Sequence, residues 1–334
     1  MKTAISAPNS AWIKYWGNRN NGLRLPVADS FSMTLDSPTV EIDIDHSETL
    51  TVKSINSDGS ERILKESEVG RFQITLDLAK KYLETLDVPE AIPASVALEI
   101  RSHIPAAVGL ASSAAVFSCF ARAIQGLIEE TINLTDEQTS VIARLGSGSA
   151  ARSASGGFIA LRAGEGDEIG SSYGEQMADE NHWVLHDFIL VPSMEEKKVG
   201  STKGHASAQS SPHFSQRVED IMERRQKECI DAVLGKDFEK LQRVAEEDCD
   251  DMHRVMLTSN PPLDYLTDVT HRIVRDIKAF RDSEHLEVFY TMDAGPTVQL
   301  LCTEESKEKV AEFANNQEDC TIFTAKTGPG ARLI

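Results

Sequence analysis

The sequence has few of the features that mark secreted, membrane-bound or metal-binding proteins. No apolar run reaches the roughly 18 residues that a membrane-spanning helix needs, and the first residues, MKTAISAPNSAWIKYWG, lack the continuous apolar core of a secretion signal. The five cysteines are scattered without a Cys-x-x-Cys pair, and the nine histidines show no His-Glu-x-x-His spacing. We therefore expect a cytoplasmic protein with reduced thiols, no disulfide framework and no structural metal.

Basic residues are also scarce, because 34 Lys and Arg stand against 53 Asp and Glu. This balance disfavours a general nucleic-acid binder and fits a solvated, soluble surface. It also requires any site for a phosphorylated ligand to be a local pocket of cationic side chains and main-chain amides. With 334 residues, of which 40% are hydrophobic, the chain is long enough for two domains with a real core.

The order of the expected elements predicts an α+β protein in two halves. The first half reads as strands and a hairpin with helices over 72–86 and 111–130, and a further helix follows Thr135 and Gln138, a capping-box pair. A polar excursion over 164–182 marks the expected boundary, which gives domains over 1–182 and 183–334. In the second half, strands flank helices expected over 216–234, 238–256 and 263–280, the last starting at the Asn-Pro-Pro of 260–262.

A small, polar stretch, PAAVGLASSA, separates a strand pattern from an Ala-rich helix pattern. The first N–H groups of a helix lack internal partners and carry positive partial charge, so small residues there let a phosphate approach closely. Gly109 supplies the turn, while Ser112 and Ser113 add hydroxyl donors or magnesium ligands. The stretch has no Lys and is not a P-loop. On these residues alone, a phosphate-binding loop and a simple strand-to-helix cap are both open.

Three further stretches carry candidate site residues. IKYWGNR places Lys14 in a strand among bulky side chains, where it should be partly desolvated. YTMDAGPT places Asp293 at a strand end before a Gly-Pro turn. GSGSAARSASGG offers the hydroxyls of Ser147 and Ser149 and the guanidinium of Arg152, which could hold a carboxylate or phosphate. Taken singly, the last two stretches could equally be a turn and a linker.

Taken together and in this order, the stretches APNSAWIKYWGNRNNGLRLPVADSFSMTLD, PAAVGLASSA, RLGSGSAARSASGGF and YTMDAGP resemble the mevalonate diphosphate decarboxylase family. That family belongs to the GHMP kinase superfamily, and the resemblance covers essentially the whole chain. It implies a two-domain fold, with a ribosomal protein S5 domain 2-like N-terminal domain and a GHMP C-terminal α+β domain. The active site would lie between the domains, and a homodimer is implied by the resemblance alone.

The resemblance also implies a reaction in isoprenoid biosynthesis that uses ATP and Mg2+. The γ-phosphoryl group passes to the tertiary 3-hydroxyl of a 5-phosphorylated mevalonate, and phosphate and CO2 then leave. By resemblance, Asp293 orients or deprotonates the hydroxyl, Lys14 keeps Asp293 ionised, and Arg152 clamps the C1 carboxylate. The expected substrate contacts are Tyr15, Asn18, Ser147, Ser149, Arg152 and Ser201. The expected ATP contacts are Gly109, Leu110, Ala111, Ser112 and Ser113, with Ser112 as the candidate magnesium ligand.

The sequence departs from the family pattern at Asn18, where many diphosphate-using members have a lysine in KYWGK. A diphosphate carries more charge than a monophosphate and should need more cationic donors. We therefore expect (R)-5-phosphomevalonate as the substrate, giving isopentenyl phosphate, with (R)-5-diphosphomevalonate as the alternative if Arg19, Arg71, Lys197, Lys198 or Lys203 compensates. A mevalonate-type kinase without decarboxylation and a non-catalytic ligand sensor are the remaining alternatives, and both fit the combination of Lys14, Arg152 and Asp293 less well.

Overall fold

The computed structural model describes residues 1–88, 91–104, 112–192 and 201–334. Its strands are β1 (Lys2–Ser6), β2 (Asn9–Ile13), β3 (Asn18–Asn20), β4 (Leu25–Pro26), β5 (Ser30–Thr34), β6 (Val40–His46), β7 (Thr51–Ile55), β8 (Glu61–Arg62), β9 (Val96–Ser102), β10 (Phe158–Arg162), β11 (Tyr173–Ala178), β12 (His186–Val191), β13 (Val288–Met292), β14 (Val298–Cys302), β15 (Thr321–Lys326) and β16 (Arg332–Leu333). Its α-helices are α1 (Glu66–Glu84), α2 (Ser112–Ile128), α3 (Asp136–Gly146), α4 (Ser201–Ser207), α5 (Phe214–Asp220), α6 (Gln226–Gly235), α7 (Phe238–Thr258), α8 (Asp268–Glu284) and α9 (Lys307–Asn315).

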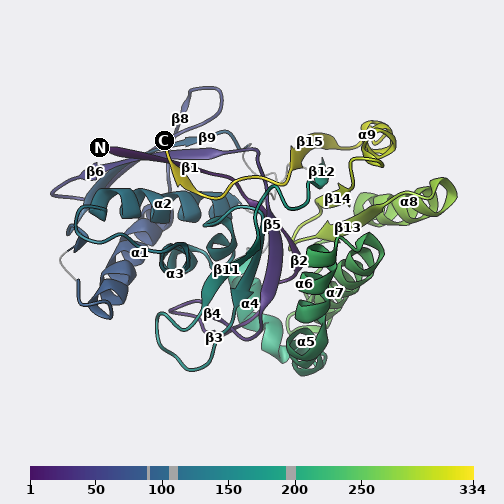
Figure 1. Cartoon of the computed structure of the whole chain (residues 1–334), viewed down its shortest axis with the longest axis horizontal. Helices are drawn as coiled ribbons and strands as arrows, with labels where there is room; N and C mark the ends of the chain where they lie inside the picture. The colour runs from purple at the N-terminus through teal and green to yellow at the C-terminus, as the bar shows by residue number, and fades with distance from the viewer. Residues whose placement is uncertain (89–90, 105–111, 193–200) are drawn as a thin grey trace.

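In the described residues, the first half of the chain contains three α-helices and three sheets, the smallest of which is the pair β3-β4. A six-stranded sheet has the order β16-β1-β6-β9-β7-β8, and a four-stranded sheet has the order β11-β10-β5-β2. The last strand, β16, pairs antiparallel with β1, so the end of the chain returns to the sheet in which it begins, and both termini lie on the same side of the molecule (Figure 1). The sequence pattern does not predict this return. The division at residue 182 stays a prediction.

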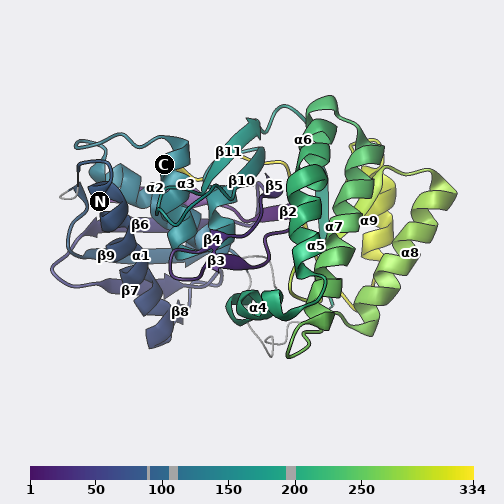
Figure 2. The ribbon, with the colours of Figure 1, turned by 90° about the horizontal axis from the view of Figure 1, so that it is seen from below.

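The second half packs helices on both faces of a four-stranded sheet with the order β13-β14-β12-β15. Because side chains alternate along a strand, each strand contributes to two cores. One face packs on α8 and α9 through Ile273, Ile277 and Val310. The opposite face joins the core of the first half, where the ring of Trp12 in β2 lies 5.6 Å from that of Phe289 in β13. Helices α6 and α7 contact β2, and Figure 2 shows them between that strand and α8.

Most of the expected elements are present, and the differences have local causes. Near the N-terminus, Pro8 separates β1 from β2 and Pro38 lies between β5 and β6, because a proline cannot donate to a strand ladder. The expected helix over 216–234 is α5 and α6 joined by a π-helical turn over Ile221–Arg225. The third helix starts at Asp268 and not at Leu263, because Thr267 accepts a hydrogen bond from the Thr270 amide and caps it there. Within the described ranges, none of the helices has the length and apolar character that crossing a bilayer requires.

Candidate active site

Two strands from opposite halves bring Lys14 and Asp293 together. Lys14 directly follows β2, and Asp293 directly follows β13 at the turn to β14. The Lys14 ammonium nitrogen lies 2.7 Å from Oδ1 of Asp293. The Lys14 side chain is only 2% exposed, whereas that of Asp293 is 31% exposed. The pair therefore joins a desolvated cation to a carboxylate that a ligand can reach.

Arg152 lies near this pair on the 3-10 turn over Gly148–Ser153, and its residue exposure is 2%. Its guanidinium donates to Oγ of Ser30 at 2.7 Å and to Oδ1 of Asn9 at 3.4 Å, while its buried Nε has no partner among the described residues. Burial lowers the pKa of Arg152 to about 10, and the charge of Asp293 opposes this shift. Arg152 is thus a buried cation whose Nε donor is unused by the described residues, which suits an anionic ligand group.

The hydroxyl groups of three serines form a short chain beside these charges. Oγ of Ser113, in the first turn of α2, lies 3.1 Å from Oγ of Ser147, which lies 3.4 Å from Oγ of Ser149. Residues 105–111, which include the expected ATP contacts Gly109, Leu110 and Ala111, lie outside the described residues, as do the side chains of Ser112 and Ser201. The start of α2 therefore meets two of the serines expected to hold the substrate.

The ring of Tyr15 packs against Gly148, which lies between Ser147 and Ser149. The Tyr15 hydroxyl donates to Oδ1 of Asn18, and burial raises the pKa of Tyr15 to about 12. Its ring packs so tightly on Gly148 that a Cβ atom there would lie 2.3 Å from Cε1 of the ring. The ring centroid of His205 in α4 lies 4.5 Å from that of Tyr15, and Nδ1 of His205 accepts the Gly17 N–H at 2.9 Å. Residues 15–18 are therefore held from both halves of the chain.

Two arginines from separate segments converge on the C-terminal end of α3, next to Ser147. Arg24 donates to the Leu145 carbonyl, and Arg71 donates to the Gly146 carbonyl at 2.9 Å. Burial, and then the charge of Arg24, lowers the pKa of Arg71 to about 10. Nε of Arg71 has no partner among the described residues. Two cationic side chains therefore lie close together at the end of α3 in this acidic chain.

Arg19, which we considered a possible substitute for the missing lysine, is engaged elsewhere. It donates to the carbonyls of Gly166 and Pro26 and to the Ser171 hydroxyl. Lys197 and Lys198 lie outside the described residues, and so does the Lys203 side chain. Arg24, Asn9 and Ser30 lie within the first stretch that carries the resemblance, but no local pattern assigns them a role, because their contribution depends on tertiary contacts.

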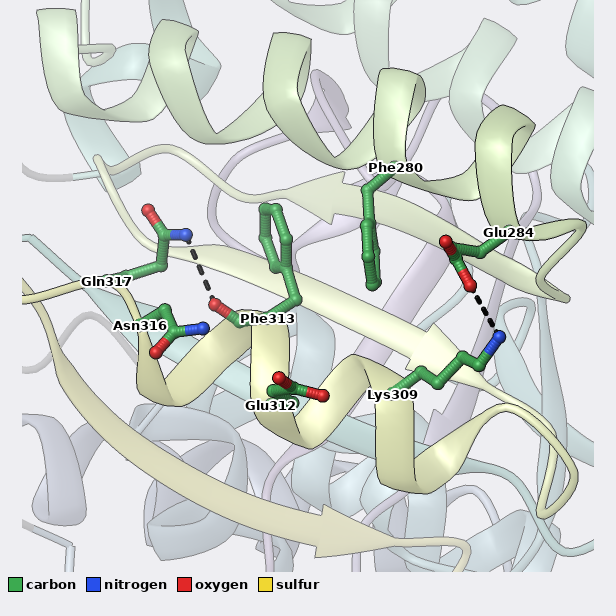
Figure 3. A pocket seen from close by; sticks show the side chains of 7 residues that line it. All are labelled: Phe280, Glu284, Lys309, Glu312, Phe313, Asn316 and Gln317. Atoms are coloured by element: carbon green, nitrogen blue, oxygen red, sulfur yellow. Dashed lines mark hydrogen bonds and ion pairs between the residues drawn. The ribbon is translucent and has the colours of Figure 1, made fainter.

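Two hollows elsewhere on the described part of the chain contain none of the predicted site residues. One of about 400 Å3 lies between α8 and α9, where the rings of Phe280 and Phe313 stack at 5.5 Å and Lys309 pairs with Glu284 (Figure 3). The other, of about 360 Å3, lies between α7 and α8. The candidate active site is therefore defined by its charged and hydroxyl groups.

Two family models together match most of the chain. Residues 6–173 match the diphosphomevalonate decarboxylase-like N-terminal domain, and residues 187–326 match the mevalonate 5-diphosphate decarboxylase C-terminal domain. The chain belongs to the diphosphomevalonate decarboxylase family. The diphosphomevalonate decarboxylase of Rattus norvegicus is 34% identical over 331 residues, which cover 94% of this chain and 78% of the rat protein. The human enzyme is 33% identical, with 93% and 78% covered. The expected family and enzyme class, a decarboxylase, are confirmed.

Solved structures agree with this membership. Mevalonate diphosphate decarboxylase from Staphylococcus aureus superposes with a TM-score of 0.86 at 26% identity, covering 100% of this chain and 97% of the other. A complex of MDDEF with MVAPP, AMPPCP and magnesium has the same TM-score and identity and covers 100% and 98%. The expected two-domain GHMP kinase α+β fold is confirmed. The roles of the individual residues stay predictions.

Proposed function

We propose that this protein catalyses the ATP-dependent decarboxylation of (R)-5-diphosphomevalonate to isopentenyl diphosphate in the mevalonate pathway. The observation that carries the proposal is the contact of 2.7 Å between Lys14 and Asp293, beside the buried Arg152, in a member of this family. The relatives from rat and human are named diphosphomevalonate decarboxylases, and this name gives the diphosphate as their substrate. A kinase or a sensor would not need this set of groups.

Asp293 and Lys14 would direct the first step, phosphorylation of the tertiary 3-hydroxyl. The Asp293 carboxylate, partly exposed at the end of β13, would accept a hydrogen bond from the hydroxyl and orient its oxygen toward the γ-phosphorus of ATP. The oxygen–phosphorus bond forms as the bond to ADP breaks, and the hydroxyl proton passes to the Asp293 carboxylate. Lys14 would keep Asp293 ionised through their ion pair. Positioning and charge supply most of the rate enhancement, since little covalent chemistry falls to the protein.

Arg152 would act in the second step, the loss of CO2. The new C3–O–phosphate bond breaks, phosphate leaves, and the electrons of the C1–C2 bond form the C2=C3 double bond as CO2 departs. A guanidinium with an unpartnered Nε, held by Ser30 and Asn9, would hold the C1 carboxylate in the geometry that this elimination needs. Ser147 and Ser149 would contribute hydrogen bonds from the other side.

ATP would bind where the start of α2 meets the serine chain. The first turn of α2 contains no acidic side chain, so its N-terminal amides are free to attract phosphate without repulsion. The complex of MDDEF with AMPPCP and magnesium supports this use of ATP and a metal. Among the described residues no cluster of three or more His, Cys, Asp or Glu could hold a metal, so magnesium would be bound largely by phosphate oxygens and water, with Ser112 as the proposed protein ligand. Magnesium would neutralise charge on the transferring phosphates.

Whether the substrate is the diphosphate or the monophosphate depends on the positive charge available to bind a second phosphate group. Our expectation of the monophosphate rested on Asn18, and the family comparisons support the diphosphate better. We propose that Arg24 and Arg71, next to Ser147, supply the positive charge that a lysine at position 18 supplies in other members. (R)-5-Phosphomevalonate remains the second candidate, because Asn18 accepts from Tyr15 and adds no charge.

A direct comparison of the two substrates tests the proposal. Purified protein, ATP and magnesium are incubated with 5-diphosphomevalonate or with 5-phosphomevalonate, and CO2, ADP and the isopentenyl product are followed. We expect faster CO2 release from the diphosphate. Turnover of the monophosphate alone would contradict the proposed role of Arg24 and Arg71, and ADP without CO2 would indicate a kinase. The homodimer implied by the resemblance stays a prediction.

A further inference from the structure

The backbone of Lys14 lies just beyond the strand pairing of its own sheet. The pairing of β2 with β5 ends at Ile13, which lies opposite Phe31, so Lys14 follows the last ladder position. Its main-chain groups are bound instead by two side chains from the second half. The Lys14 N–H donates to Oδ2 of Asp248 at 2.7 Å, and the Lys14 carbonyl accepts from Nη2 of Arg217 at 3.3 Å.

The two side chains that bind Lys14 also bind each other. Nη2 of Arg217 donates to Oδ2 of Asp248 at 2.8 Å, the same oxygen that receives the Lys14 N–H. Arg217 is 1% exposed and Asp248 is 0% exposed. A buried ion pair is costly to form and stabilises a protein little in net terms, so its retention is better explained by the geometry that it imposes. Here that geometry is imposed on the backbone of Lys14.

A local irregularity of the helix helps to build this network. Arg217 in α5 and Arg225 at the end of the π-helical turn both contact Asp248 and Asp251 on α7. Eight steps along a regular α-helix would leave their side chains about 80° apart around the axis. The π-helical turn over Ile221–Arg225 contains about one residue more than an α-helical turn. Each of its residues therefore advances by a smaller angle, and most of the difference of about 80° disappears. The π-helical turn therefore aligns both arginines toward α7.

We infer that Asp248 and Arg217 are positioning residues for decarboxylation, acting through the backbone of Lys14. They touch neither Asp293 nor the expected substrate groups in the contacts above; they place the Lys14 ammonium group against Asp293. This inference rests on the proposed role of Lys14. It also makes the ion pair between the halves depend on how α5 packs on α7 and how α7 packs against β2.

Asp248→Asn tests the inference, with Asp251→Asn as a matched control. Asp251 lies one helical turn further along α7, is also buried, and pairs with the same two arginines. Of the two aspartates, it is Asp248 that binds the Lys14 backbone. We expect Asp248→Asn to lower kcat for CO2 release by about 10- to 100-fold, with KM for both substrates within about twofold. Asp251→Asn should keep kcat within about twofold, although it loses comparable thermal stability.

A double-mutant comparison separates positioning from general damage. In a Lys14→Met background, Asp248→Asn should add less than about a twofold further loss, because the group that it positions is gone. An equal loss of kcat in Asp251→Asn, or a full further loss in the Lys14→Met background, would overturn the inference.

A milder substitution covers the case in which Asp248→Asn does not fold. Arg217→Lys keeps the charge but loses the planar fork that reaches both the Lys14 carbonyl and Asp248, so kcat should fall at unchanged KM. A folded Arg217→Lys variant with full kcat would overturn the inference. Absence of CO2 release from the unmodified protein would overturn the proposed function and the inference with it, whereas an active protein with an equally active Asp248→Asn variant would overturn the inference alone.

Discussion

The Lys14 ammonium nitrogen and Oδ1 of Asp293 lie 2.7 Å apart, although 279 positions separate the two residues in the sequence. Each follows the last residue of a strand, β2 in one half of the chain and β13 in the other. The contact therefore forms only when the two halves pack together through Trp12 and Phe289. Folding of the whole chain, and not of either half, creates the proposed catalytic pair.

Arg152→Gln should lower CO2 release by about 100-fold or more, because the substrate carboxylate loses a buried cationic donor. ATP binding should be nearly unchanged, since Arg152 lies on the 3-10 turn and not at the start of α2. Steady-state kinetics and nucleotide titration measure the two effects. Arg162→Gln is the control, because Arg162 pairs with Asp29 and Glu175 away from the site. A similar loss of rate in both variants would contradict the assigned role.

Gly148→Ala should raise KM for the phosphorylated mevalonate by about tenfold. The new Cβ atom would meet the Tyr15 ring at 2.3 Å, so the ring and its hydrogen bond to Asn18 must move. Gly70→Ala is the matched control, because nothing lies within 4 Å of a Cβ atom at that helical position. The control should keep KM and gain up to about 1 kcal/mol in stability. An unchanged KM in Gly148→Ala would exclude Tyr15 as part of the substrate site.

Asp187→Asn should stabilise the protein at neutral pH. Asp187 in β12 is fully buried, and neither carboxylate oxygen has a hydrogen-bond partner among the described residues. Burial raises the pKa of Asp187 well above its ordinary value of 3.8. The folded state thus keeps a proton that the unfolded chain releases. The stability contribution of this proton is complete below pH 3.8 and is lost as the pH rises through the folded pKa.

Urea unfolding at pH 7 and pH 4.5 measures this effect. The free energy of unfolding of Asp187→Asn should exceed that of the unmodified protein by about 1–3 kcal/mol at pH 7, and the gain should shrink at the lower pH. Asp29→Asn is the comparison, because the Asp29 carboxylate accepts the Ala163 N–H at 2.7 Å and pairs with Arg162. It should give no gain at either pH. A loss of stability in Asp187→Asn at pH 7 would contradict the account.

The sequence predicts the site residues that stand in compact motifs. It does not assign roles to residues that tertiary contacts bring to the site from other segments. Lys14, Arg152 and Asp293 lie beside glycines in short, distinctive stretches, so their neighbourhood identifies them. Arg71 enters only as one of several possible substitutes for the missing lysine, and Arg24 has no assigned role. The two come from separate segments and meet only at the end of α3, which no local pattern records. The same holds for Asp248, which looks like one more surface acid of α7 in the sequence.

Elements with strong periodicity were also predictable, whereas their junctions were not. The apolar spacing of α7 predicts a helix over nearly its full length. The π-helical turn before α6 has no periodic signal, because it differs from an α-helix by only one residue. The short strand β16 depends on its partner β1 at the other end of the chain, and a two-residue pairing leaves no pattern to read.

The most direct test compares CO2 release from 5-diphosphomevalonate by the unmodified protein and by Asp293→Asn, with ATP and magnesium present. The account predicts CO2, ADP and isopentenyl diphosphate in equal amounts from the unmodified protein. It predicts at least about a 1,000-fold slower reaction from Asp293→Asn, with folding and ATP binding retained. Near-full decarboxylation by Asp293→Asn would contradict the role of the Lys14–Asp293 pair, and no CO2 from the unmodified protein would contradict the proposed function.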